Sequence, residues 1–255
     1  MENCFLKIQP VILKECVLRF ITLKKKFWKN ISNERLNAFQ MGISVKERLA
    51  GARLYCVTRP PSGGRTYKES VESACRGGAD IVQLREKKLS AKELVSLARE
   101  LKEICARYSA LFIVNDCLDS ALEAGADGVH LGQNDLPLEE ARKIAAGRVS
   151  KFIIGCSTHS IEQALSAEAL GADYIGCGPI FQTPTKPDTP AVGLDLIREY
   201  RERIHIPFVA IGGIDETNVD QVRMAGGRAI AVVRAVFDSR DIEGACRSLK
   251  NKIIN

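Results

Sequence analysis

The sequence lacks the features that mark secreted, membrane-spanning or disulfide-linked proteins. Its nine cysteines are odd in number, include no CxxC pair and mostly lie inside apolar runs, where cysteine behaves as a small hydrophobic residue. We therefore expect reduced thiols and a cytoplasmic protein. The apolar run at residues 11–23 is interrupted by charges and too short for a membrane span, and no secretory cleavage pattern follows it. No stable membrane insertion is expected.

Most of the chain also lacks an excess of charge of either sign. The net charge of +6 comes from residues 1–50, which hold ten Lys or Arg and four Glu, whereas the remaining 205 residues hold 27 basic and 27 acidic side chains. This balance gives no reason to expect a nucleic-acid partner for the body of the protein.

Residues 1–50 differ in texture from the rest. The basic and aromatic residues at 24–28 are compatible with an amphipathic segment on a membrane surface or a partner. A simpler interpretation is favoured, because Met41 begins a run that resembles a native start and leads into the first expected strand. We expect 1–40 to be a dispensable extension or a misassigned start. We accordingly divide the chain into a basic extension at 1–50, dispensable or disordered, and a catalytic domain at 51–255.

An internal repeat organises the remainder. Gly-Ala-Asp begins at 78, 125 and 171, and Gly-Gly-Arg takes the same place at 226. Each triplet precedes a short apolar run, and four further apolar runs alternate with these. The eight expected strands are 53–59, 81–85, 111–116, 128–132, 151–157, 174–178, 207–213 and 229–233.

Helical periodicity fills the gaps between these runs. It is clearest at 91–108, where apolar residues line one face and charges the other. The other expected helices are 66–77, 117–125, 137–146, 160–170, 193–203, 216–225 and 239–252. Apolar strands that alternate with helices indicate a parallel sheet covered by helices. A repeat of two βα units, present four times, predicts an α/β fold, a (β/α)8 TIM barrel, with a doubly wound open sheet as the weaker alternative.

In such a barrel the active site lies at the carboxyl ends of the strands. These positions gather cations, carboxylates, hydroxyls and glycines: Gln83, Arg85, Lys87, Asn115, Asp116, Asp135, Ser157, Thr183, Thr185, Lys186, Gly212, Gly213, Val233 and Arg234. This combination predicts a site for a phosphorylated substrate and a metal ion.

Residue type suggests individual roles. Arg85, Lys87 and Lys186 offer positive charge for a diphosphate, and the carboxylates of Asp116 and Asp135 suit oxygen coordination of Mg²⁺. Because both carboxylates follow consecutive parallel strands, they are expected to meet at one end of the sheet.

Plainer interpretations stay open for the same positions. Asp116 and Asp135 are also typical helix caps, and Gly212-Gly213 is compatible with either a phosphate site or a simple tight turn. His130 alternates onto the interior of its strand, which favours packing over a role as a base.

Six motifs occur in order with family-like spacing: QLREK (83–87), VND (114–116), GADGVHLGQNDLP (125–137), GCSTHS (155–160), GPIFQTPTK (178–186) and AIGGI (210–214). The set resembles thiamine-phosphate synthase, also called thiamine-phosphate pyrophosphorylase, over about 53–250. The resemblance implies that 4-amino-2-methyl-5-(diphosphooxymethyl)pyrimidine and 4-methyl-5-(2-phosphooxyethyl)thiazole, both small molecules, are joined into thiamine phosphate with release of diphosphate. Residues 1–50 have no counterpart in it.

The resemblance also implies a role for each matching residue. The implied contacts of the pyrimidine diphosphate are Gln83, Arg85, Lys87, Asn115, Ser157 and Lys186, of which Arg85, Lys87, Ser157 and Lys186 are the catalytic candidates. The implied Mg²⁺ ligands are Asp116 and Asp135. The implied contacts of the thiazole phosphate are Thr183, Thr185, Gly213, Val233 and Arg234. The chain departs from the family at Arg234, where serine is common.

The implied mechanism is dissociative substitution. Cations stabilise the departing diphosphate, the thiazole nitrogen captures the pyrimidine methylene cation, and no protein nucleophile is needed. The loop at 183–192 is the expected lid. Two alternatives are a thiazole tautomerase on the same scaffold and a non-catalytic phosphate-binding regulator, but neither needs the complete diphosphate and metal set. The sequence is also compatible with a homo-oligomer.

Overall fold

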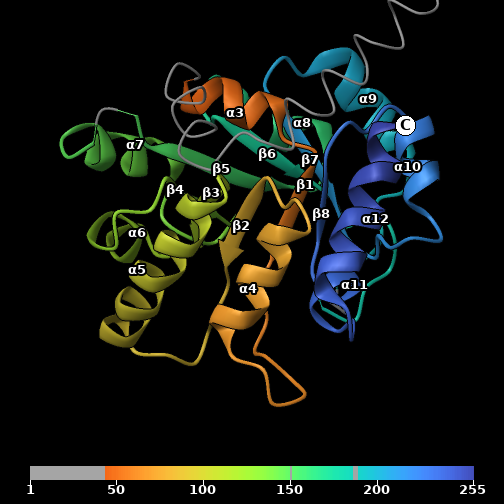
Figure 1. Cartoon of the computed structure of the whole chain (residues 1–255). Coiled ribbons are helices and arrows are strands. Elements are labelled where there is room, and N and C mark those ends of the chain that lie inside the picture. The colour runs from red at the N-terminus through yellow and green to blue at the C-terminus, as the bar shows by residue number, and fades with distance from the viewer. Residues whose placement is uncertain (1–43, 150, 186–188) are drawn as a thin grey trace, which may run out of the picture. The chain divides into compact units, whose positions relative to one another are not determined.

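The chain forms a closed barrel of parallel strands surrounded by helices (Figure 1). The computed structural model describes residues 44–149, 151–185 and 189–255. Each strand pairs in parallel with the next, and β8 pairs with β1 to close the ring. The predicted TIM barrel is therefore confirmed, and the open-sheet alternative is excluded.

The strands lie within the eight predicted apolar runs. They are β1 (Leu54–Val57), β2 (Ile81–Leu84), β3 (Leu111–Asn115), β4 (Gly128–Leu131), β5 (Ile153–Thr158, one residue beyond its run), β6 (Tyr174–Cys177), β7 (Phe208–Ile211) and β8 (Ile230–Val232).

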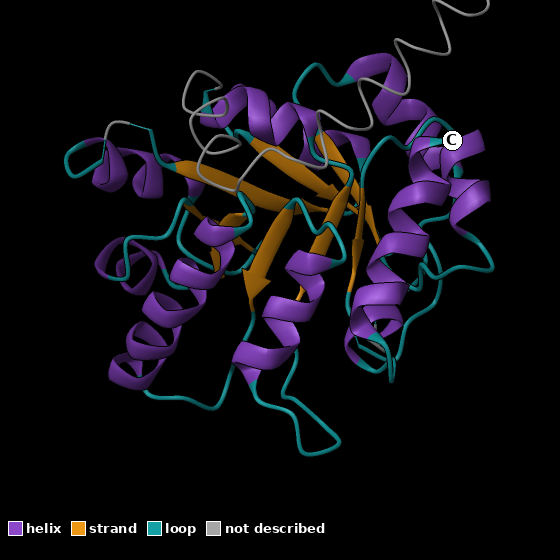
Figure 2. Ribbon diagram, viewed as in Figure 1, coloured by secondary structure: helices purple, strands orange, loops and turns teal. Residues whose placement is uncertain are grey.

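Helices alternate with the strands and cover the outside of the barrel (Figure 2). Those predicted by periodicity are α4 (Tyr67–Arg76), α5 (Ala91–Arg107), α6 (Leu118–Glu123), α7 (Leu138–Ala146), α8 (Ile161–Ala169), α9 (Asp195–Arg203), α10 (Val219–Met224) and α12 (Ile242–Ile254). Two short helices were not predicted, α3 (Val45–Gly51) and α11 (Arg234–Phe237). Within the described ranges, no helix is long and apolar enough to span a membrane.

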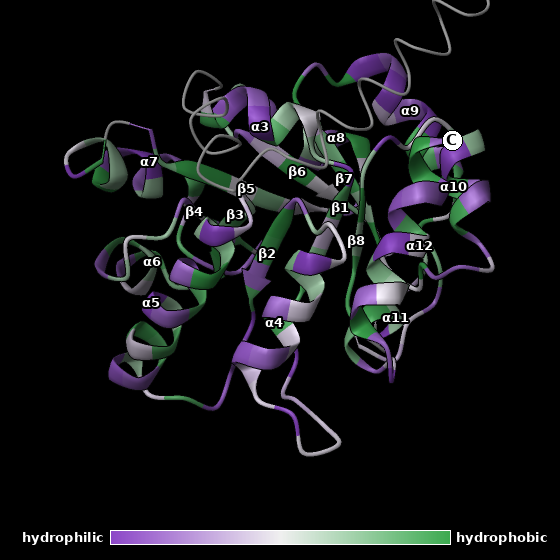
Figure 3. Ribbon diagram, viewed as in Figure 1, coloured by the Kyte–Doolittle hydropathy of each residue, from purple (hydrophilic) through white to green (hydrophobic). Residues whose placement is uncertain are grey.

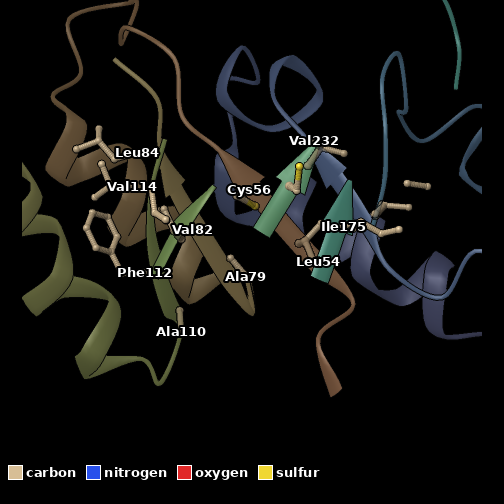
Figure 4. Packing of buried hydrophobic residues seen from close by; sticks show 14 of the residues in the cluster. Leu54, Cys56, Ala79, Val82, Leu84, Ala110, Phe112, Val114, Ile175 and Val232 are labelled. Atoms are coloured by element: carbon tan, nitrogen blue, oxygen red, sulfur yellow. The ribbon is translucent and has the colours of Figure 1, made fainter. Parts of the chain in front are cut away.

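Side chains alternate between two apolar layers. Outward residues of the strands, such as Leu54, Phe112 and Ile175, pack against the helices (Figure 4). Inward residues such as Ile81 and Ile113 fill the barrel itself. The hydropathy pattern agrees, since apolar colour lies on most strands and polar colour on the outer surfaces of the helices (Figure 3). The cysteines of the described residues are free, as predicted, and all but Cys117 are buried.

Helix α3 closes the amino-terminal end of the barrel. Leu49 is 4% exposed and belongs to the interior apolar cluster, while Arg48 Nη2 donates to the Ser109 carbonyl at 2.9 Å. Ser44 and Glu47 form a capping box that starts the helix, each side chain accepting the backbone N–H of the other residue. The compact unit that contains the barrel begins at Ser44 and so includes residues that the sequence assigned to the extension.

The aspartates of the repeat fasten this same end. Asp80 Oδ2 accepts the Leu54 N–H at 3.0 Å, and Asp127 Oδ2 accepts the Phe112 N–H at 2.7 Å. Asp173 Oδ2 accepts that of Ile154 at 2.9 Å. Each carboxylate also pairs with a cation on a helix, namely Lys250, Lys102 or Arg142. Each of these aspartates immediately precedes an even-numbered strand, β2, β4 or β6. Its carboxylate binds the backbone at the start of the preceding strand, β1, β3 or β5.

Candidate active site

A cavity of about 800 Å³ opens at the carboxyl ends of the strands. Its size is typical of a site for small molecules. The predicted site residues that line it are Gln83, Arg85, Lys87, Asn115, Asp116, Asp135, Ser157, Thr183, Thr185, Gly212, Gly213, Val233 and Arg234. Lys186, the remaining candidate, lies outside the described residues, as does part of the expected lid at 183–192.

The backbone holds both aspartates of the cavity in place. Asp116 has φ = +64°, a left-handed conformation that Asp and Asn tolerate better than most residues, and its N–H donates to the His130 carbonyl at 2.8 Å. Asp135 Oδ2 accepts the Gly132 N–H at 2.6 Å. Neither residue caps a helix, because α6 begins after Cys117 and α7 after Pro137, and both helices lack a side-chain cap. The interpretation of these aspartates as caps is therefore wrong.

The electrostatics of the pair are unusual. Burial and, next, the adjacent Asp135 carboxyl raise the pKa of Asp116 to about 6, against the lowering effect of Lys87 and Arg85. The Asp116 carboxyl thus interacts directly with Asp135, and two facing carboxylates form a donor set that suits a hard cation.

Cations and amides come from the neighbouring strand. Gln83 is 4% exposed and points into the barrel, whereas Arg85 is half-buried and Lys87 is exposed at the cavity mouth. The Arg85 N–H donates to Thr58 Oγ1 at 3.0 Å, which fixes the loop that carries both cations.

The glycine pair after β7 is required by close packing. Both residues have positive φ, 108° at Gly212 and 63° at Gly213. A Cβ on Gly212 would lie 2.4 Å from Pro179, and one on Gly213 would lie 2.7 Å from the Gln182 carbonyl. The loops after β6 and β7 therefore lie against each other, and Phe181 N–H donates to the Gly212 carbonyl at 3.0 Å.

Arg234 lies at the first turn of α11 and is held near a carboxylate. Its Nε lies 3.9 Å from Asp238 Oδ2, and the same carboxylate accepts from Arg59 Nη1 at 2.6 Å. Two cations thus share Asp238 at the side of the cavity where a thiazole phosphate was expected. The sequence did not single out Arg59 or Asp238.

The thiamine monophosphate synthase family model matches residues 54–236, from the start of β1 into α11. The chain belongs to the thiamine monophosphate synthase family.

Relatives agree with this assignment. The thiamine-phosphate synthase of Methanocella arvoryzae is 48% identical over 199 residues, covering 77% of this chain and 92% of that protein. That of Shouchella clausii is 48% identical over 199 residues, with 77% and 94% covered. The solved structure of thiamine phosphate pyrophosphorylase from Pyrococcus furiosus superimposes with a TM-score of 0.74 at 38% identity, covering 81% of this chain and 97% of that one. As a thiamine monophosphate synthase, the chain is a transferase of thiamine biosynthesis.

The cavity of this chain also contains residues that were not predicted from the sequence. Tyr55 and Tyr174 point into the cavity from β1 and β6 and are 3% and 0% exposed. From the sequence they look like ordinary apolar-core residues. Their inward positions follow from strand alternation, but their contacts depend on closure of the barrel. His130 also points inward, as alternation predicted, and each ring nitrogen is hydrogen-bonded.

Proposed function

We propose that this synthase joins 4-amino-2-methyl-5-(diphosphooxymethyl)pyrimidine to 4-methyl-5-(2-phosphooxyethyl)thiazole, giving thiamine phosphate and diphosphate by Mg²⁺-assisted dissociative substitution. The observation that carries the proposal is one cavity lined by two facing carboxylates and two cations, Asp116 and Asp135 with Arg85 and Lys87. A diphosphate and its metal ion need both kinds of group together.

The donor set fits Mg²⁺ shared with substrate. Among the described residues, no cluster of three or more His, Cys, Asp or Glu could hold a metal by itself. Mg²⁺ is commonly bound by one or two carboxylates, with water and substrate phosphates completing the octahedron. Asp116 and Asp135 would supply the carboxylates. When bound, Mg²⁺ supplies neutralisation of the negative charge that develops on the diphosphate.

The protein's own side chains would bind and orient the pyrimidine diphosphate. Arg85 presents a planar fork and Lys87 a point charge to the diphosphate, and Lys186 would add a third cation. Asn115 and the Ser157 hydroxyl offer neutral hydrogen bonds to the same substrate. As the bond to the leaving group breaks, this preorganised positive charge stabilises the transition state more than the ground state.

The other side of the cavity is suited to the second substrate. Backbone at Gly213 and Val233, the hydroxyls of Thr183 and Thr185, and the Arg234 guanidinium would bind the thiazole phosphate. This arrangement would direct the thiazole nitrogen toward the pyrimidine methylene carbon. The barrel walls, together with the two bound substrates, would limit access of water, which would otherwise trap the methylene cation.

The direct test incubates the full-length protein with both substrates and Mg²⁺ and measures thiamine phosphate and diphosphate. Equal amounts of the two products are expected, with none in EDTA and recovery on adding Mg²⁺. Folded protein that forms no thiamine phosphate under these conditions contradicts the proposal. Isomerisation of a thiazole phosphate without diphosphate release would instead support the tautomerase alternative.

A further inference from the structure

Five polar side chains form a continuous hydrogen-bonded chain inside the barrel, where TIM barrels usually pack branched apolar residues. Its members come from five strands, and we call it the hydroxyl chain: Gln83, Tyr55, Tyr174, His130 and Ser157. The four successive distances are 2.8, 2.8, 2.9 and 2.9 Å. All five residues line the cavity, so the chain links one wall to the other.

The structure contains room made for this chain. A Cβ on Gly155 of β5 would lie 2.1 Å from Cζ of Tyr174, so only glycine leaves space for the phenol ring. Tyr174 is fully buried, and its hydroxyl lies 2.8 Å from Tyr55 and 2.9 Å from His130 Nδ1. Burial raises the pKa of both tyrosines, so their hydroxyls stay protonated and can donate.

Hydroxyls and a neutral imidazole can each donate or accept, so the chain can run in either direction. Its Gln83 end favours one of them. Gln83 Nε2 is an amide nitrogen and donates to the Tyr55 oxygen. With the Tyr55 oxygen accepting from Gln83, Tyr174 is the acceptor left for the buried Tyr55 proton. In this direction the Tyr174 hydroxyl donates to His130 Nδ1, which requires the Nε2–H tautomer of His130.

This direction determines which atoms of His130 and Ser157 carry a proton. With Nδ1 accepting, neutral His130 carries its proton on Nε2 and donates to Ser157 Oγ at 2.9 Å. The Ser157 oxygen is then occupied as an acceptor by His130, and its own proton points to another partner. Ser157 lines the same cavity as Arg85 and Lys87, so this proton is available to a bound substrate.

We propose that the hydroxyl chain orients Ser157 as an obligate hydrogen-bond donor to an anionic oxygen of the substrate. This inference rests on the proposed function for the identity of that oxygen, which would belong to the diphosphate. Tyr55, Tyr174 and His130 are positioning residues that act through Ser157. If every hydrogen bond of the chain ran the other way, the Ser157 hydroxyl would donate its proton to His130. Only the lone pairs of the Ser157 oxygen would then face the substrate, and these repel an anion.

The tautomer of His130 tests the direction without any activity measurement. The sequence has three histidines, so the ¹⁵N-histidine spectrum of the full-length protein is simple, and His130→Asn identifies the signal. We expect the Nε2–H tautomer in the wild-type protein and a mixture in Tyr174→Phe. An Nδ1–H tautomer in the wild type means a reversed chain and overturns the proposal, whatever the activity assay gives.

Kinetics test the route through Ser157. We expect Tyr174→Phe to lower kcat/KM for the pyrimidine diphosphate about tenfold, as loss of a supporting hydrogen bond does at other sites. In a Ser157→Ala background the same substitution should have no further effect, because its only target is gone. Independent, multiplicative losses would show a merely structural role and contradict the proposal.

Tyr200→Phe is the matched control. Its buried hydroxyl lies 2.9 Å from Thr158 Oγ1 and 2.8 Å from the Ser160 carbonyl, within hydrogen-bond distance of both and outside the cavity. It should lose stability comparably to Tyr174→Phe but keep wild-type kcat/KM and the Nε2–H tautomer of His130. Absence of turnover in every variant, the wild type included, contradicts the proposed function and leaves the tautomer measurement to decide the direction of the chain.

Discussion

The two ends of the barrel use aspartate in opposite ways. At the amino-terminal end, Asp80 accepts two backbone N–H groups and pairs with Lys250 at 2.7 Å. At the carboxyl-terminal end, Asp116 faces another carboxyl, Asp135, and burial raises its pKa. The Asp80 carboxylate is neutralised by a cation of the fold itself, whereas the Asp116 and Asp135 pair is suited to neutralisation by a bound cation. Stability and function are thus separated along the barrel axis.

The largest expected effect comes from Asp116→Asn. Asparagine tolerates the left-handed backbone but removes the charge, so we expect turnover to fall about 10²–10³-fold, as on loss of one preorganised electrostatic contact. Steady-state rates over a range of Mg²⁺ concentrations measure this. Turnover unchanged at all Mg²⁺ concentrations would remove Asp116 as a metal ligand.

The same variant should be more stable than wild type in EDTA. The folded-state pKa of Asp116, about 6, lies above its usual value, so ionisation destabilises the fold as pH rises from about 4 to about 6. Above pH 6, Asp116→Asn should raise Tm by about 2–4 °C, and below pH 4 the difference should vanish. A lower Tm at pH 7 would contradict the account in which burial, and then Asp135, disfavour the charged form of Asp116.

Asp80→Ala tests the opposite end. It leaves the N–H groups of Arg53 and Leu54 without their acceptor and Lys250 without its carboxylate. We expect the free energy of unfolding, measured in urea, to fall by about 2–3 kcal/mol. The folded enzyme should keep kcat/KM within about twofold, and a large loss of activity would show that the ends are not independent.

A smaller effect is expected at Arg234, where the chain departs from its family. The side chain is half exposed, and Asp238 already pairs closely with Arg59. Arg234→Ser should therefore change KM for the thiazole phosphate by less than about fivefold, with KM for the pyrimidine diphosphate unchanged. A loss much greater than fivefold would make Arg234 a principal phosphate ligand.

Deleting residues 1–40 should have the smallest effect, leaving kcat/KM and Tm unchanged. Leu49→Ala gives the contrast, because Leu49 is buried in the barrel interior and its truncation should lower the free energy of unfolding by about 2–3 kcal/mol. Loss of folding in the deletion would place part of 1–40 in the domain.

The sequence predicted the strands well because the repeat and the apolar runs are local signals. It missed α3, which lies in the stretch assigned to the extension, and α11, which at four residues is too short to show a helical period. The capping box at Ser44 and Glu47 was the available signal for α3. The cavity residues followed from topology, since the end of each parallel strand faces one side. The hydroxyl chain could not be predicted, because contacts among five strands depend on the closed ring.

One strand pair differs from the other three in how it is tied. Arg228 stands where Asp80, Asp127 and Asp173 stand in their repeats, so β8 offers no carboxylate to the start of β7. The barrel therefore has a seam at β7–β8. Amide hydrogens at the start of β7 should exchange with deuterated solvent sooner than those at the start of β1, β3 or β5. The strand pair without this tie is the one whose carboxyl ends lead to Gly213 and Val233, on the side of the cavity proposed to bind the second substrate.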